Sequence, residues 1–275
     1  MTKVNFTKPF TQQEAIPQAG IERAVDILKT GRLHRYNLLP DEAGEAAALE
    51  MEYAEWQGAD YCVACTSGGY AIQLGLRICG VEPGDKVLAN AYTLAPVPGA
   101  IHNVGGVPVL VDIDENYHID LDDLAAKADQ ADVLLLSHMR GHICDMDRLL
   151  ALCGATDIKI IEDCAHTMGA KWRGRWSGRD GIIGCYSTQT YKHLNSGEGG
   201  FLVTDDDAVM ARAVVLSGSY MLYGRHLAAP GAEAFEAVKY DTPNISGRMD
   251  HLRAAILRPQ LQRLASQCAA WNTRY

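Results

Sequence analysis

The chain has 275 residues, a length that fits one large domain with or without a small second one. Apolar residues make up 48% of it and charged residues 21%, which excludes general disorder and allows a sizeable core. The net charge of −9 disfavours binding to nucleic acid or to an anionic membrane, because both kinds of partner require a basic surface.

The N-terminal residues are polar and contain no apolar core of a signal peptide. No apolar run in the chain reaches the roughly 18 residues that crossing a bilayer requires. The eight cysteines are too sparse for a disulfide scaffold, and in a reducing compartment they stay reduced. We therefore expect a soluble cytoplasmic protein.

Residues 1–19 are expected to form an irregular arm, and helices are expected over 20–30 and 43–57. Short β-rich runs then alternate with helical patterns. The strands are expected at 61–65, 86–90, 107–113, 131–137, 158–163, 182–187 and 199–204, and the later helices at 69–79, 95–104, 120–128, 145–153 and 206–217. A Gly/Pro/Tyr-rich stretch follows over 218–247, and a long helix begins near Arg248. Such alternation, with nearly continuous apolar strands, indicates an α/β fold with a mainly parallel sheet covered on both faces.

Cysteine and histidine pairs raise the question of a metal site. Cys62 and Cys65 form a single CxxC inside an apolar run, which favours buried thiols in a strand. His138, His142 and Cys144 have an HxxxH spacing that needs a helix, yet this segment follows a strand and contains a glycine. We expect no metal there. His138 and Arg140, on a loop at the end of a strand, are alternative substrate contacts.

Ligands of open α/β sheets bind at the carboxyl ends of the strands, so the residues that follow each strand are the candidates. Ser67-Gly68-Gly69 opens a helix, where free amides suit a phosphate or where the serine simply caps the helix. Asp163 ends a strand and could bind a metal, orient a histidine, hold a protonated heterocyclic nitrogen or cap a helix. Lys192, five residues after Ser187, is either a surface charge or an amine held for Schiff-base chemistry. A phosphate cradle, a carboxylate and a lysine, each after a different strand, together match the needs of pyridoxal 5′-phosphate.

From about residue 20 onward the chain resembles the DegT/DnrJ/StrS aminotransferases, the sugar aminotransferase group of fold-type I pyridoxal-phosphate enzymes. The resemblance is carried by several blocks in order, among them TSGGYAIQLGLRICGVEPGDKV, IEDCAHTMGAKWRGRWSG, GCYSTQTYKHLNSGEGGFLVTDD and SGRMDHLRAAILRPQLQRL. It implies the large domain of that fold, a seven-stranded mostly parallel sheet between helices. The implied reaction moves an amino group from an amino acid, glutamate or glutamine, to a keto-sugar, cyclitol or related ring.

The resemblance also implies roles for individual residues. Lys192 would be the Schiff-base lysine and proton shuttle, and Asp163 would pair with the pyridine nitrogen. His166 stands where the family usually has glutamine near the 3-hydroxyl of the cofactor, as in the aminohydroxybenzoate-synthase branch. Ser187 would donate its hydroxyl to the phosphate, together with the amides of Ser67, Gly68 and Gly69.

Some positions depart from the family pattern. Gly69 replaces a threonine that usually adds a hydroxyl to the phosphate site. Leu94 replaces an aromatic ring that usually stacks on the cofactor, and we expect Tyr92 to supply that ring instead. Ser246 replaces an asparagine that reaches the phosphate of the neighbouring subunit, and we expect Asn244 to substitute for it. These departures bear on cofactor affinity and substrate fit.

The expected organisation is an arm at 1–19, a pyridoxal-phosphate domain at 20–247, and over 248–275 the start of a helix that leads to a missing small domain. Leu257, Leu261 and Leu264 on this helix would then leave an apolar stripe that needs cover. We expect a homodimer or a chain completed by a partner, and a poor transaminase when it is alone. The alternatives are a lyase or dehydratase on the same scaffold and a non-catalytic half-enzyme.

Overall fold

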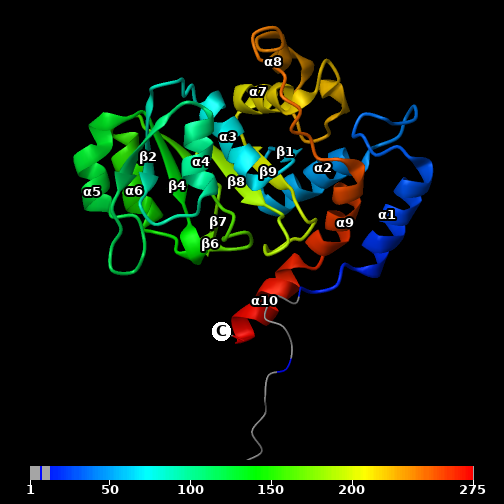
Figure 1. The fold of residues 1–275 in the computed structure, drawn as a ribbon, viewed down its shortest axis with the longest axis horizontal. Helices are drawn as coiled ribbons and strands as arrows, with labels where there is room; N and C mark the ends of the chain where they lie inside the picture. The colour runs from blue at the N-terminus through cyan, green and yellow to red at the C-terminus, as the bar shows by residue number, and fades with distance from the viewer. Residues whose placement is uncertain (1–6, 8–12, 275) are drawn as a thin grey trace, which may run out of the picture.

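A seven-stranded sheet forms the centre of the structure (Figure 1), a computed structural model that describes residue 7 and residues 13–274. The strands are β1 (Tyr61–Cys65), β2 (Lys86–Asn90), β3 (Val107–Val111), β4 (Val133–Ser137), β5 (Lys159–Asp163), β8 (Ile183–Ser187) and β9 (Gly200–Thr204). Their order is β1-β9-β8-β5-β4-β2-β3, in which β9 runs antiparallel to both neighbours and every other adjacent pair is parallel. The expected α/β fold is confirmed, and each expected strand matches within two residues.

Helices cover both faces of the sheet (Figure 1). They are α1 (Gln18–Thr30), α2 (Glu45–Gln57), α3 (Gly68–Ile78), α4 (Pro96–Asn103), α5 (Leu121–Lys127), α6 (Met146–Gly154), α7 (Asp207–Gly218), α8 (Ala232–Glu236), α9 (His251–Leu261) and α10 (Leu264–Arg274). The core under α3, α4 and α7 lies on one face, while α2 with α9, and α5 with α6, bury the other. Sequence reasoning missed α8 and a small hairpin of β6 (Lys171–Trp172) and β7 (Arg175–Trp176), because such short elements leave no periodic pattern.

Side-chain alternation along each strand assigns residues to the two faces. In β1, Val63 and Cys65 pack under α3, whereas Cys62 and Ala64 pack under α2. Both cysteines are fully buried, as the sequence predicted, and all eight cysteines are free thiols within the described residues.

The C-terminal helices belong to the main core. Leu257, Leu261 and Leu264 are at most 5% exposed and pack in the cluster that contains Tyr53 of α2. The expected uncovered stripe is therefore wrong. Helix α9, which carries Leu257 and Leu261, lies against α1 and α2, and Leu264 at the start of α10 packs in the same cluster. Pro259 lies inside α9, and a two-residue break separates α9 from α10. The expected arm, residues 1–19, lies mostly outside the described residues, and α1 already begins at Gln18.

A buried ion pair ties the segment before α2 to the sheet. The Arg35 guanidinium donates to both carboxylate oxygens of Glu50, at 2.7 and 2.8 Å, and Glu50 also accepts from the amide of Ala64 in β1. Arg35 and His226 hold the pKa of Glu50 at about 2, against burial that raises it. Because removing one partner would leave an unpaired buried charge, this pair fixes the chain entry into α2.

Within the described residues, no helix is long and apolar enough to cross a membrane.

Candidate active site

A cavity of about 970 Å³ opens at the carboxyl end of the sheet, between α3, α4 and the loops that follow β1, β4, β5 and β8. Its size is that of a site for a cofactor or a small substrate. Its position is the one that parallel strands dictate, because their carboxyl ends meet at one edge. The predicted residues that the structure brings together on its walls are Ser67, Gly68, Gly69, Asp163, His166, Ser187 and Lys192.

The first turn of α3 forms one end of the cavity. Ser67 caps the helix, and its Oγ accepts from the amide of Tyr70 at 3.0 Å. The amides of Gly68 and Gly69 belong to the turn in which a helix provides no internal acceptor, so they suit an anion. A Cβ at Gly68 would lie 2.8 Å from the Cβ of Ser187, so only glycine lets the Ser187 side chain lie against this helix end.

Asp163 stands at the end of β5 and opens into the cavity. Its carboxylate accepts from the Ser137 hydroxyl at 3.1 Å and from the amide of Ala165 at 3.1 Å. Ser137 in turn accepts from the hydroxyl of Thr93 at 2.8 Å. Burial raises the pKa of Asp163, partly offset by these hydrogen bonds. The carboxylate thus accepts two hydrogen bonds from neighbouring groups and retains capacity to accept more. A positively charged ring nitrogen would complement such a buried carboxylate.

Lys192 lies across from Asp163 and contacts His166. The Lys192 Nζ is 2.8 Å from the His166 Nε2, and the main-chain amide of Arg140 donates to the His166 Nδ1 at 3.1 Å. Burial lowers the pKa of Lys192, as does Arg140, whereas Asp163 raises it. The pKa of His166 is lowered to about 4, first by burial and then by Lys192 and Arg140. A lowered pKa favours the neutral amine of a lysine, which is the form that acts as a nucleophile and accepts a proton.

The loop that carries Lys192 is anchored from two sides. The Lys192 amide donates to the carbonyl of Gln189 at 2.8 Å. The Gln260 side chain of α9 exchanges two hydrogen bonds with the backbone of Asn195, at 2.9 and 2.8 Å. Because α9 is part of the core, it restrains the position of the lysine loop.

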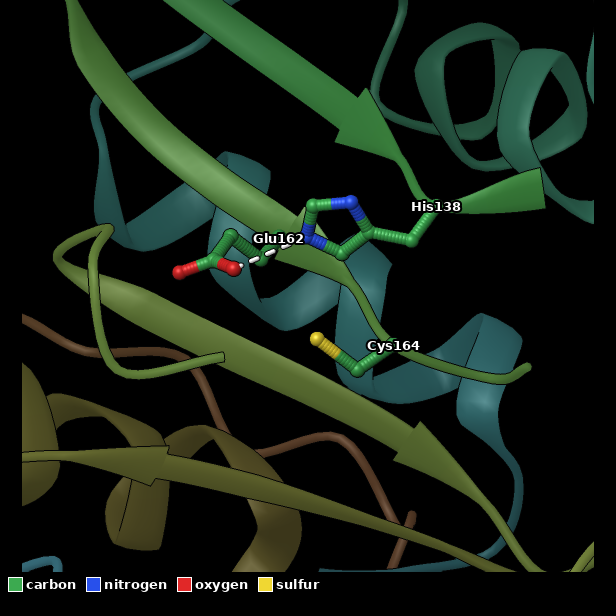
Figure 2. A group of neighbouring side chains, drawn as sticks. All are labelled: His138, Glu162 and Cys164. Carbon is green, nitrogen blue, oxygen red and sulfur yellow. Dashed lines mark hydrogen bonds and ion pairs between the residues drawn. The ribbon is translucent and has the colours of Figure 1, made fainter. Parts of the chain in front are cut away.

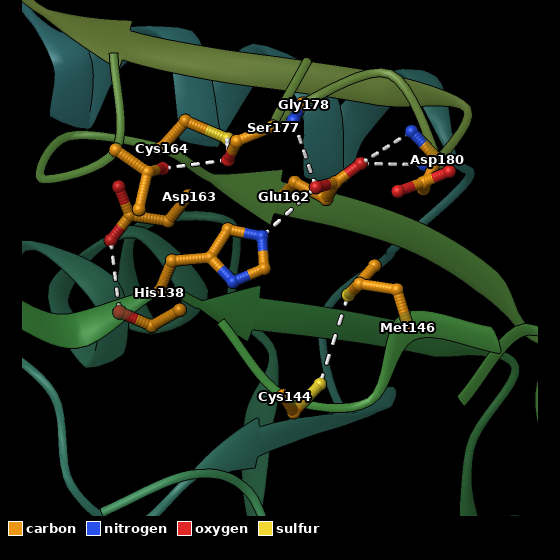
Figure 3. Close-up of polar contacts among 12 residues, drawn as sticks. His138, Cys144, Met146, Glu162, Asp163, Cys164, Ser177, Gly178 and Asp180 are labelled. Carbon is orange, nitrogen blue, oxygen red and sulfur yellow. Dashed lines mark hydrogen bonds and ion pairs between the residues drawn. The ribbon is translucent and has the colours of Figure 1, made fainter. Parts of the chain in front are cut away.

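Directly beside Asp163, Glu162 forms a buried group that points away from the cavity residues. His138, Glu162 and Cys164 place their ligand-type atoms within 4.8 Å of one another (Figure 2). Glu162 accepts from His138 at 2.9 Å and from the amides of Gly178, Asp180 and Gly181 at 2.9, 2.8 and 2.6 Å (Figure 3). These donors lower the pKa of Glu162 against the burial that raises it. Because these donors account for the geometry, we assign this group a structural role.

This placement corrects the expectations for the loop after β4. His138 is 1% exposed and pairs with Glu162, so it does not contact substrate. The three residues considered for a metal site, His138, His142 and Cys144, do not come together. His142 lies beside the rings of Tyr117 and His118, while the Cys144 thiol contacts Met146.

Two predicted residues do not reach the cavity walls. The Tyr92 ring lies 5.4 Å from the Tyr117 ring, and Leu94, not Tyr92, lines the cavity. Tyr92, which was expected to supply a ring to the cofactor, therefore does not line the cavity of this chain, because its ring turns to the neighbouring loop. Asn244 and Ser246 are exposed and do not line the cavity of their own chain. Their predicted role requires a second copy.

Arg140, which the sequence offered as a substrate contact, lines the cavity. Sequence reasoning gave no role to Gln189, Tyr191 and Glu198, which line the same cavity. All three follow β8, so the strand-end rule was the signal that could have found them. Arg140 adopts a left-handed backbone with φ 57°, which a sequence does not reveal for a non-glycine residue.

The chain is similar to proteins of one family. Residues 19–274 match the model of the DegT/DnrJ/EryC1/StrS aminotransferase family. A putative L-glutamine:3-amino-2,3-dideoxy-scyllo-inosose aminotransferase of Micromonospora echinospora is 40% identical over 58% of this chain and 39% of its own length. The L-glutamine:scyllo-inosose aminotransferase of Streptomyces griseus is 33% identical over 92% of this chain and 61% of its own.

A solved structure shares the fold. The crystal structure of 3-amino-5-hydroxybenzoic acid synthase superposes with a TM-score of 0.79 at 29% identity, covering 96% of this chain and 66% of that one. The matches to MosB of Rhizobium meliloti and to the Micromonospora relative cover 37% and 39% of those proteins. The chain thus spans well under two thirds of these curated relatives.

Proposed function

Because the chain belongs to the DegT/DnrJ/EryC1/StrS aminotransferase family, we propose that it holds pyridoxal 5′-phosphate in the cavity at the end of the sheet and takes part in amino-group transfer. The proposed donor is glutamate or glutamine, and the proposed acceptor is a keto-sugar, a cyclitol or a related ring. The two scyllo-inosose aminotransferases among the relatives support this pairing, since their names specify a glutamine donor and a cyclitol acceptor.

The residues present fit this cofactor. The first turn of α3 and Ser187 form an anion cradle that a Cβ at Gly68 would fill, which suits the phosphate. Asp163 has acceptor capacity left, which suits the protonated ring nitrogen. Lys192 offers its amine from the opposite loop. When bound, the cofactor supplies an electron-withdrawing ring next to the carbon that exchanges its amino group.

Each of these side chains then has a defined task. Asp163 remains ionised when a cation faces it, because the opposite charge offsets the cost of burial. Lys192 holds or delivers a proton at its Nζ, and its lowered pKa favours the neutral form that accepts one. His166 orients Lys192, and the cap of α3 together with Ser187 fixes the phosphate end.

The observation that carries the proposal is that Lys192 and Asp163, 29 positions apart in the sequence, line one cavity together with the start of α3. Borohydride reduction in the presence of pyridoxal 5′-phosphate, followed by peptide mass spectrometry, is expected to locate the pyridoxyl label on Lys192. Lys192→Ala should lose the label and the yellow absorbance, whereas Lys86→Ala, at the exposed start of β2, should keep both. A label on another lysine would refute the assignment.

The donor and acceptor are tested separately from the cofactor. Incubation with glutamate or glutamine and a panel of keto-sugars and inososes is expected to yield the corresponding amines. Elimination products would instead support the lyase or dehydratase alternative. Cofactor labelling without either product would support the half-enzyme that needs a partner chain.

We also propose a homodimer, or an assembly with a partner chain, in which Asn244 and Ser246 reach a neighbouring site. Their exposure in the single chain supports this arrangement. Light scattering that finds a monomer with tightly bound cofactor would contradict it. The cytoplasmic location and the division at residues 19 and 247 remain predictions of the sequence.

A further inference from the structure

The contacts around His166 determine where its ring proton sits. A main-chain amide can only donate, so the His166 Nδ1 must present a lone pair to the Arg140 N–H, which lies at 3.1 Å. A neutral imidazole carries one ring proton, and an imidazolium carries one on each nitrogen. The Arg140 contact therefore excludes the imidazolium and the Nδ1–H form. The ring proton lies on Nε2.

The tautomer of His166 also restricts the charge of Lys192. Its Nζ lies 2.8 Å from the His166 Nε2, and that nitrogen is already a donor. An ammonium group has three donors and no lone pair, so it cannot accept this hydrogen bond. A neutral amine can. The pair is satisfied only when Lys192 is uncharged.

The backbone, rather than a titrating side chain, sets this arrangement. Arg140 and Gly141 adopt left-handed conformations with φ of 57° and 88° in the turn η2 (Met139–Gly141). This turn directs the Arg140 amide toward His166, so the restraint does not depend on pH.

The charged surroundings act on the pair in both directions. Asp163 favours the ammonium form of Lys192, while burial and the Arg140 side chain oppose it, and the pKa of Lys192 is lowered. The other ionisable residues that line the two pockets shared by Lys192 are Glu198, His193, Glu14, Arg263, Tyr70 and Tyr191. The lowered pKa of His166, about 4, agrees with a neutral ring at physiological pH.

We propose that His166, fixed as its Nε2–H tautomer by the amide of Arg140, is a positioning residue that holds Lys192 as a neutral amine before any ligand arrives. This deepens the proposed function but concerns only groups of the chain itself. The same two hydrogen bonds can be made by a glutamine at position 166. A glutamine can accept from the Arg140 amide through its carbonyl and donate to Lys192 through its amide nitrogen, whereas glutamate and leucine cannot do both.

The test uses the full chain freed of cofactor with hydroxylamine. Nitrogen-15 correlation spectra of the histidine side chains, with the His166 signal assigned by its loss in His166→Gln, are expected to show the Nε2–H tautomer at pH 7. An Nδ1–H or imidazolium signature would overturn the proposal, and this measurement needs no folded variant other than the one used for assignment.

A second readout follows the charge of Lys192. The rate of labelling by trinitrobenzenesulfonate, which attacks neutral amines, is measured at Lys192 by peptide mass spectrometry against Lys86 in the same sample. His166→Gln should keep the rate within about twofold, whereas His166→Glu should lower it about tenfold, the effect of one pKa unit. Equal rates in the glutamate and glutamine variants would overturn the proposal. Because no cofactor or substrate is present, failure of transamination would not affect either result.

Discussion

Two adjacent carboxylates at the carboxyl end of β5, Glu162 and Asp163, lie in opposite environments. Glu162 is 1% exposed, accepts four hydrogen bonds and has a lowered pKa. Asp163, one residue later, accepts two, opens into the cavity and has a raised pKa. Alternation along the strand places them on opposite faces (Figure 3). The satisfied carboxylate of Glu162 therefore stabilises the fold, whereas Asp163 has acceptor capacity left for the ligand that we propose.

The sharpest test of the structural side is Glu162→Gln. The amide cannot accept from three main-chain amides and His138 as a carboxylate does, and its own N–H₂ would meet donors. We expect the free energy of unfolding to fall by about 3 to 5 kcal/mol, the cost of breaking a buried charged network. Urea unfolding at neutral pH measures it. Glu115→Gln, at an exposed loop position, is the control and should change stability by less than about 0.5 kcal/mol.

On the cavity side, Asp163→Asn should weaken cofactor binding and leave the stability of the fold intact. Affinity for pyridoxal 5′-phosphate is expected to fall about a hundredfold, close to 2.7 kcal/mol, because the ring nitrogen loses its counter-charge. The free energy of unfolding should stay equal or rise, since the variant removes a carboxylate that burial penalises. Fluorescence titration and urea unfolding give the two numbers. Loss of stability as large as in Glu162→Gln would contradict the division of roles.

The two carboxylates should also differ in how stability follows pH. The folded-state pKa of Glu162 is below its unfolded value of about 4.3, so its stabilisation is complete above that pH and is lost as the pH falls through the folded pKa. The difference in unfolding free energy between the wild type and Glu162→Gln should therefore become smaller below about pH 4.

The contribution of Asp163 to stability should change with pH in the opposite direction. Its folded-state pKa is raised above the unfolded value of about 3.9, so its penalty is present above the folded pKa and is relieved as the pH falls through it. Any stability advantage of Asp163→Asn should be seen at neutral pH and disappear in acid. Unfolding free energies of the three proteins across pH 3 to 8 test both statements, and parallel curves would refute them.

The smallest expected effect concerns Ser137→Ala. This removes one of the two donors to Asp163 and the acceptor of the Thr93 hydroxyl, at a cost of about 1 kcal/mol. The pKa of Asp163 should rise further, which carbon-13 detected titration of the carboxyl group would show. An unchanged pKa would mean that Ser137 does not tune the carboxylate.

Much of this architecture was readable from the sequence. Mainly apolar runs of five to seven residues located every strand of the main sheet. Strands covered on both faces, such as β4 and β8, require such a composition, whereas the edge strand β3 is apolar although it is largely exposed. The strand-end rule then selected Ser67, Asp163, Ser187 and Lys192, which the structure brings to one cavity. Their roles remain predictions that the labelling and binding experiments address.

The errors came from contacts between distant segments. Leu257, Leu261 and Leu264 form an apolar stripe in the sequence, and only the packing of α9 against α2 shows that the same chain covers it. Tyr92 was a reasonable substitute ring two residues from Leu94, yet the turn after β2 directs it to Tyr117.

The sequence by itself determined the α/β fold, the strand positions and the set of side chains at the strand ends, because periodicity and topology are local or nearly local properties. The tertiary structure decided which of two consecutive carboxylates is satisfied, that a main-chain amide fixes the tautomer of His166, and which helix buries the C-terminal leucines. These depend on donors and surfaces that lie tens to hundreds of residues away. A single sequence contains no record of which distant amide will point at a given side chain.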